Sequence, residues 1–294
     1  MARAPSQLDF FVASPADALP VKSQQDLMAR AWFSLSKNKR IQPIEHQIGN
    51  NFVKITPSAE HGCATIWDYD VVLFVISHWV DEINQGRTPP KGIIFTPYEY
   101  FRWKGVKGSG REYERLRASL ERLHTTQIET NIRQGRKKTY HSFYFVSSWT
   151  EEMTDGRVDG LRLDLAPWLH EAVVKNKKLI LTLDDEYFEL TGGLQRWLYL
   201  YVRKAAGRQA TGWRESFKLL YEKSGSVGKL SRFKSHLRDL IAEQGLPHYY
   251  LEEYEGTDGE SYLVMTRRGE LHQSHPEHEI EYFNKHKGSR PKLL

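Results

Sequence analysis

The amino-acid sequence predicts an α+β fold made of two winged-helix domains in tandem. A basic helical pattern occurs twice at a constant offset of 117 residues, as R-L-R-x-x-L-x-x-L from Arg115 and as R-F-K-x-x-L-x-x-L from Arg232. Each copy is followed by two extended, aromatic-rich runs with a turn between them. A basic amphipathic helix followed by a hairpin is typical of a winged helix, whose recognition helix enters a major groove of duplex DNA.

The distribution of charge supports the same prediction. The chain has 294 residues, 39% hydrophobic and 12% aromatic, which is enough for two globular domains. Its net charge is only +5, but residues 102–138 hold eleven Lys or Arg against four Glu, and residues 203–238 hold ten against two. The two basic blocks coincide with the two helical repeats, and the remainder is acidic on balance. This clustering favours a DNA-binding surface over charge that serves only solubility.

The N-terminal residues 1–30 are expected to form a flexible arm, because prolines and polar residues are scattered through them. Cys63 is the single cysteine, which excludes an intrachain disulfide and favours a reducing compartment. The sequence has no signal-peptide pattern and no apolar run long enough to span a bilayer. We therefore expect a cytoplasmic protein with no membrane partner.

Residues 31–184 are predicted to form the first winged-helix domain, with additional strands for dimerisation and DNA-backbone contacts. The expected elements are, in chain order, a strand at 64–67, a helix at 71–83 capped by Asp68, a strand at 93–95, a helix at 98–103 begun by Thr96 and Pro97, the recognition helix at 111–124, and a hairpin of strands at 126–133 and 140–148.

The first recognition helix has two faces at 100° per residue. The face expected in the core carries Tyr113, Leu116, Leu120 and Leu123. The opposite face is a basic stripe of Arg111, Arg115, Ala118 and Arg122. Arginine can reach guanine or phosphate in a major groove, and alanine can meet a thymine methyl group. The hairpin that follows is predicted to be a wing that touches phosphates or the minor groove with three cations at its tip, Arg136, Lys137 and Lys138.

Residues 185–269 are predicted to form the second winged-helix domain. The stretch before it, at 158–184, alternates strands with a helix and is expected to pack against the first domain or to bridge the two. The expected elements are a helix at 194–206, a supporting helix at 216–223, the recognition helix at 229–243, and a hairpin of strands at 249–254 and 261–266. The tip of this second hairpin is acidic and is expected to contact DNA less than the first. Residues 270–294 are expected to be a polar tail.

The residues predicted to bind DNA come from the two recognition helices, the turn before the first one and the first wing. They are Lys107, Arg111, Arg115, Ala118, Arg122, Arg136, Lys137, Lys138, Lys229, Arg232, Lys234, Ser235 and Arg238.

Catalytic and metal sites find little support in the sequence. Asp68 and Asp70 suggest a carboxylate pair, but capping of the helix that follows explains them more simply. Tyr199 and Tyr201 lack the His-hydrophobic-His motif of a nicking enzyme and are expected to pack in the core or at an interface. The regularly spaced histidines after residue 270 lie in an expected tail. We expect no enzymatic activity, no cofactor and no metal.

Several segments resemble the plasmid replication initiator protein A family. The most specific are ATIWDYD at 64–70 and YERLR at 113–117, and FSLSK at 33–37, TTQIET at 125–130 and KSGS at 223–226 are similar too. The resemblance covers roughly residues 8–268. It implies a bacterial plasmid initiator with two winged helices, which binds direct repeats (iterons) at an origin and helps to open the adjacent AT-rich DNA.

The resemblance also implies partners. Family relatives bind iterons as monomers and repress their own gene as homodimers, and they recruit the host replication initiator, helicase loader and helicase. Two alternatives to an initiator stay open at this point: a winged-helix transcriptional regulator without a replication role, and a DNA-nicking enzyme of the relaxase type.

Overall fold

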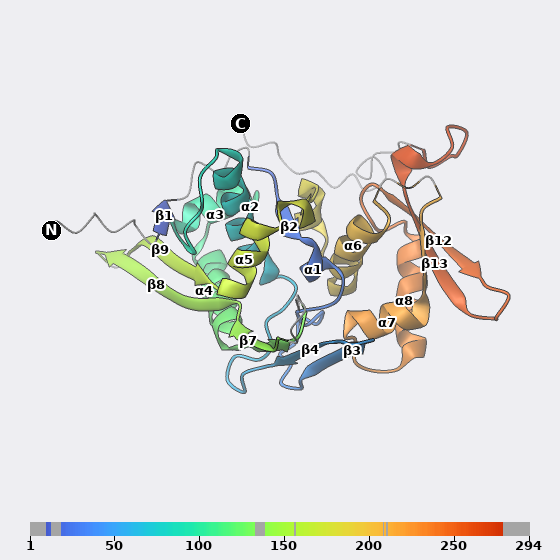
Figure 1. Cartoon of the computed structure of the whole chain (residues 1–294), viewed down its shortest axis with the longest axis horizontal. Coiled ribbons are helices and arrows are strands. Elements are labelled where there is room, and N and C mark those ends of the chain that lie inside the picture. The colour runs from blue at the N-terminus through green and yellow to red at the C-terminus, as the bar shows by residue number, and fades with distance from the viewer. Residues whose placement is uncertain are drawn as a thin grey trace.

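Two units share one arrangement of three helices and a three-stranded sheet, although two further strands follow the third helix in the first unit only, and the hairpins of the two units lie at opposite ends of the long axis (Figure 1). The computed structural model describes residues 10–12, 19–132, 139–155, 157–207, 209 and 211–278. The first unit consists of α2 (Tyr69–Asn84), β5 (Gly92–Phe95), α3 (Pro97–Trp103), α4 (Gly110–Thr125), β8 (Val146–Thr154) and β9 (Arg157–Leu165). The second consists of α6 (Gly193–Ala205), β11 (Trp213–Ser216), α7 (Phe217–Ser224), α8 (Leu230–Ala242), β12 (Tyr249–Glu255) and β13 (Ser261–Arg267).

The sheets of the two units also share their strand order. The second sheet runs β11-β13-β12, and the first runs β5-β9-β8 with β1 (Phe10–Val12) added in parallel beyond β5. In both units the last strand of the hairpin is therefore central, and it pairs antiparallel with the short strand between the first two helices. The mixed α and β architecture expected from the sequence is confirmed.

Local sequence signals explain where the helices begin. Thr96 forms a capping box with Glu99, and Pro97 supplies a backbone angle that suits the first helical turn of α3. Ser109 caps α4 by accepting a hydrogen bond from the Glu112 amide. α2 is different, since it is buried around nearly its whole circumference and therefore lies at the centre of its unit.

The hairpin after α4 is not the counterpart of the one after α8. Its strands β6 (Gln127–Thr130) and β7 (His141–Tyr144) do pair, but they belong to a separate sheet of order β3-β4-β6-β7. That sheet is completed by β3 (Ile44–Ile48) and β4 (Asn51–Thr56), and the place held by β12 and β13 in the second unit is taken by β8 and β9. The prediction that residues 126–148 form the wing is therefore wrong. Strand pairing across the chain, rather than proximity to the helix, decides which hairpin joins the sheet.

The N-terminal arm is also shorter than expected. Residues 22–24 form β2 (Lys22–Gln24), which pairs with β10 (Ile180–Thr182), and α1 (Gln25–Met28) follows directly. Val21, Leu27 and Met28 are buried in the core, so burial of these apolar side chains outweighs the loop-like composition of this stretch. The expected strand at 64–67 is reduced to one isolated bridge between Thr65 and Ser34.

The stretch between the units is regular, as the sequence predicts. It contains α5 (Pro167–Lys175), the 3₁₀ turn η2 (Lys177–Leu179), β10 and the 3₁₀ turn η3 (Asp185–Glu189). Beyond β13 lies the 3₁₀ turn η4 (Arg268–Glu270), after which His275 packs its ring on Tyr250. Among the described residues, no helix is both long and apolar enough to cross a membrane.

The two units are joined through their cores. Buried apolar side chains of α2, α4, α6 and α8 belong to one continuous cluster. Inside it, the Arg196 guanidinium of α6 lies 2.9 Å from the Asp70 carboxylate of α2, and both side chains are almost fully buried. The Lys104 ammonium group approaches the other oxygen of Asp70 at 2.8 Å. The relative orientation of α2 and α6 is thus fixed by a buried, charge-assisted contact.

Candidate nucleic-acid interface

The exposed face of α4 carries much of the predicted basic stripe. Leu116, Leu120 and Leu123 are buried as expected, and this burial turns Arg111 and Arg115 to the solvent. Arg115 forms an ion pair with Glu112, one turn earlier on the same helix. Lys107 is exposed in the turn ahead of the helix.

Arg122 is engaged elsewhere. Its Nε and one terminal nitrogen donate to the two carboxylate oxygens of Asp68 at 2.7 and 2.6 Å. These bonds raise the pKa of the arginine and hold it half-buried against α2. Asp68 also accepts bonds from Ser119 and Thr65, and its side chain makes no cap bond to α2. The expectation that Asp68 acts as a helix cap is therefore wrong, because Arg122 and Ser119 compete for the same oxygens.

The exposed face of α8 is the second predicted surface. Phe233 and Leu237 are buried, while Lys229, Arg232 and Ser235 are exposed and Lys234 is half-buried. Arg238 is exposed but donates to both carboxylate oxygens of Glu253 on β12, at 2.8 to 3.2 Å. These hydrogen bonds raise the pKa of Arg238 and lower that of Glu253. Arg238 is thus positioned by the hairpin strand, whereas Arg232 has no such neighbour on the hairpin.

Two grooves run along these helices, and they share a wall. We call them the α4 groove and the α8 groove. The first is lined from α4 by Glu112, Arg115, Ala118, Ser119 and Arg122. The second is lined from α8 by Ser231, Arg232, Phe233, His236, Asp239 and Leu240. Asn38 and Lys39 line both grooves, so the exposed faces of the two helices open toward the same segment of chain.

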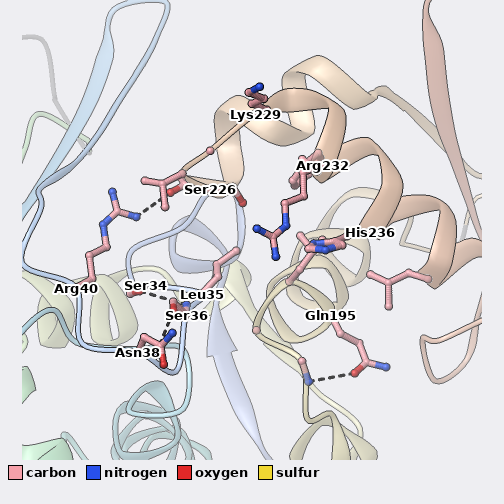
Figure 2. A pocket seen from close by; sticks show the side chains of 18 of the residues that line it. Ser34, Leu35, Ser36, Asn38, Arg40, Gln195, Ser226, Lys229, Arg232 and His236 are labelled. Atoms are coloured by element: carbon pink, nitrogen blue, oxygen red, sulfur yellow. Dashed lines mark hydrogen bonds between the residues drawn. The ribbon is translucent and has the colours of Figure 1, made fainter.

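Figure 2 shows the α8 groove at close range. Arg232 and His236 point from α8 toward the segment that carries Ser34 to Arg40, and Lys229 lies at the rim. Arg40 stands on the opposite wall, where its guanidinium donates to the Gly225 carbonyl at 3.1 Å. The groove is therefore bordered by cationic side chains from both walls.

The residues of this shared wall are not among those predicted to bind DNA. Residues 33–37 contribute only to the family resemblance, and no site is expected at residues 38–40. A signal was available in the charges, because the chain carries cations and no acidic residue between Asp26 and Glu45. The predicted wing residues Arg136, Lys137 and Lys138 lie outside the described part of the chain.

The two tyrosines considered for DNA nicking are structural. Tyr199 is buried and donates its hydroxyl proton to Asp184 at 2.7 Å, and Tyr201 donates to Glu215 at 2.5 Å. Burial, with these neighbouring carboxylates, raises the pKa of both phenols. Neither hydroxyl is therefore placed or ionised as a nucleophile for a DNA phosphate.

Comparison with known proteins supplies the family. The chain matches the Replication initiator protein A family over residues 22–251. A protein of Wigglesworthia glossinidia brevipalpis, named "Putative replication protein", is 36% identical over 247 residues, which span 82% of this chain and 88% of that protein. The chain belongs to the replication initiator protein A family. This membership confirms the resemblance seen in the sequence and makes the protein a replication initiator of a plasmid or other replicon.

The fold of this initiator is shared with solved structures. Two crystal structures of domains 2 and 3 of RctB superpose with TM-scores of 0.58 and 0.54 at 14% and 16% identity. Each covers 83% of this chain, and the alignment includes 98% and 96% of the respective RctB chain. At this level of identity the likeness concerns the fold.

Proposed function

We propose that this initiator binds direct repeats at its replication origin through two winged helices, with α4 and α8 as the recognition helices. The observation that carries the proposal is the shared surface of the two grooves. Two basic helices from units of the same topology open toward one common wall. This arrangement suits a ligand that is long, anionic and continuous, as duplex DNA is.

The order of elements supports the assignment of winged helices. A winged helix places its recognition helix third and follows it with a hairpin that pairs with a short strand after the first helix. α8 followed by β12 and β13 fits this order, as does α4 once β8 and β9 are taken as its hairpin. The solved relatives of this fold are described as two domains, which agrees with a division into units at 31–184 and 185–269.

The chemistry of the exposed residues divides the expected contacts into two kinds. Arg115 and Arg232 are long, exposed and directed into the grooves, so they can donate paired hydrogen bonds to guanine. Ala118 can meet a thymine methyl group, while Lys107, Arg111, Lys229 and Lys234 suit phosphates. Arg122 and Arg238 serve mainly to orient the helices, because each donates to both oxygens of a carboxylate outside its own helix, whereas Arg115 is paired only with Glu112 on its own exposed face.

The proposal extends to the partners that the family implies. The monomer would bind iterons and help to open adjacent AT-rich DNA, and the homodimer would bind the promoter of its own gene and repress it. The assembled origin complex would recruit the host replication initiator, helicase loader and helicase. Its place of action is the bacterial cytoplasm, and no cofactor or catalytic step of its own is needed.

Binding to the DNA that flanks the gene tests the proposal. The wild-type protein should protect tandem repeats in a footprint. If it neutralises roughly eight phosphates, a plot of log affinity against log salt concentration should have a slope of about −7. Arg115→Ala and Arg232→Ala should each weaken binding roughly 5- to 150-fold and relax the preference at one base position.

Lys178→Ala, an exposed cation outside both grooves, is the matched control and should bind like wild type. A uniform loss of affinity over all sequences in the arginine variants would mean that they contact phosphates alone. Protection of a single palindrome ahead of an unrelated operon would point to a transcriptional regulator, and failure to bind the flanking DNA at all would overturn the proposal.

A further inference from the structure

We propose that Lys37 and Lys39 form a third DNA-contacting element, which binds the phosphates of the backbone between the two major grooves entered by α4 and α8. This inference rests on the proposed function and adds residues to it. The chemical class of the ligand is the phosphodiester backbone of a duplex, without regard to base sequence. Together with Asn38, we call these residues the basic tip.

The basic tip stands where a continuous duplex would pass from one helix to the other. Lys37, Asn38 and Lys39 line the α4 groove, and Asn38 and Lys39 also line the α8 groove. In a duplex read at two successive major grooves, the DNA between the two readings presents its backbone to the protein. Lysine side chains at this point therefore face phosphates rather than base edges.

The charge of the basic tip is available for binding. Lys37, Asn38 and Lys39 are exposed, and the neighbouring sequence from residue 27 to residue 44 contains no acidic residue. The Lys37 ammonium group lies 5.3 Å from the centre of the Trp67 ring, a contact that leaves its charge unneutralised. Within the described part of the chain, neither lysine forms an ion pair with a carboxylate.

The basic tip is fixed to both units. On the side of the first unit, the Arg40 carbonyl accepts a bond from the Cys63 amide at 2.8 Å, and the Ser34 amide donates to the Ala64 carbonyl at 2.8 Å. On the side of the second unit, the Arg40 guanidinium donates to the Gly225 carbonyl. These bonds hold the chain on both sides of the tip against residues of both units.

A close backbone approach adds to this attachment. A Cβ atom at Gly193, the first residue of α6, would lie 1.9 Å from the Leu35 carbonyl oxygen, so only glycine permits the observed contact. The segment is thus held against the start of α6 as well as against the turn between α7 and α8. Because this cationic element is already ordered, it loses little conformational entropy when it binds phosphate.

The side chains at the tip point to backbone contact rather than base recognition. A lysine ammonium group is a compact charge without fixed direction, which suits phosphate and carries little sequence information. Arg40 has its guanidinium bound by the Gly225, Gln42 and Pro43 carbonyls, so it positions the tip and does not act as a ligand.

The double variant Lys37→Ala/Lys39→Ala tests the inference in the full-length protein, with origin DNA and a scrambled duplex of the same length as probes. Loss of two phosphate contacts should make the salt slope less steep by about 1.8 and weaken binding roughly 10- to 60-fold at about 0.1 M salt. The loss should be equal on both probes, and ethylation interference should disappear at phosphates between the two regions contacted in the major groove.

Lys177→Ala/Lys178→Ala is the matched control, because it removes two exposed lysines outside both grooves. The inference is overturned if the tip variant keeps the wild-type slope and interference pattern, or if it behaves like the control. It is also wrong if the loss is confined to origin DNA, since that would indicate base reading. If the wild-type protein binds neither probe, the proposed function itself fails, and this result is distinguishable from all the others.

Discussion

His78 links the stability of this protein to pH. Its side chain is 1% exposed on α2, and its ring packs edge-on against Phe74 with the ring centres 4.5 Å apart. Burial lowers the pKa of His78 to about 4, although the nearby Glu82 opposes this shift. The folded protein therefore keeps the ring neutral at a pH where the unfolded chain protonates it.

We predict that this difference costs stability in acid. Because the folded pKa lies below the unfolded value of about 6.5, the contribution is neutral above that pH and grows more unfavourable as the pH falls toward 4. The free energy of unfolding should drop by roughly 3 kcal/mol from this group alone between pH 7 and pH 4. Urea unfolding of the wild type and of His78→Leu at both pH values measures the effect, and the variant should lose less stability on acidification.

His272→Leu provides the control, since that histidine is exposed beyond β13. It should follow the wild-type pH dependence. An equal loss of stability on acidification in the wild type and His78→Leu would show that the buried ring does not govern this part of the pH profile.

The ion-pair partners of Asp68 and Asp70 could not be predicted from the residues around them. Both stand at the start of a helix, where an acidic residue is normally a cap, and the cap interpretation follows from local sequence. Their partners, Arg122 and Arg196, are 54 and 126 residues away along the chain. No local rule pairs groups at such separations, so the burial of Asp70 and its role between the units become visible only in the folded structure.

Among the elements, α2 and α6 depend on one another through the buried Asp70–Arg196 contact. Removing one partner of a buried ion pair leaves an uncompensated charge in the core, which typically costs 3–5 kcal/mol. We predict a loss of roughly this size in denaturant unfolding for Asp70→Leu, which leaves both Arg196 and Lys104 without their carboxylate. Arg196→Met should destabilise by less, because Lys104 still pairs with Asp70, and the double variant should lose less than the sum of the single variants, because the two side chains interact directly.

An exposed pair is the natural comparison. Lys175 and Glu171 of α5 are 2.9 Å apart with side chains 69% and 59% exposed, so Lys175→Met should change stability by less than about 1 kcal/mol. Strict additivity of the Asp70 and Arg196 substitutions would contradict a direct contact between α2 and α6.

The elements themselves were largely predictable, and their pairing was not. Apolar periodicity and capping residues predicted α2, α3, α4, α6, α7 and α8 close to their observed bounds, because these signals are local. The two extended runs after α4 were also recognised as a hairpin. Their membership of the β3-β4-β6-β7 sheet depends on pairing with β4, which lies about 70 residues earlier in the chain. The alternation of apolar residues predicts a strand, but it does not indicate which other strand it pairs with.

For the whole molecule, the repeated helix predicted two similar units but not how they are joined. The continuous core, the Asp70–Arg196 contact and the sheet of β3, β4, β6 and β7 connect them, and the His46 ring of β3 lies 2.8 Å from the Glu222 carbonyl of α7. Figure 1 shows this sheet extending below both units. These contacts leave α4 and α8 little freedom to move relative to one another.

We predict that the spacing between the two halves of each origin repeat is fixed. If α4 and α8 read successive major grooves from a rigid frame, inserting 5 bp between the half-sites turns one of them by half a helical turn, to the far side of the duplex. Affinity should fall roughly 100-fold or more, because all base contacts of one unit are lost. Inserting 10 bp restores the angle but adds a turn of length, so a rigid protein should not recover its affinity. Gel-shift titrations measure both, with the same insertions placed outside the repeat as controls. Recovery with 10 bp would mean that the two units move independently, contrary to the joined core.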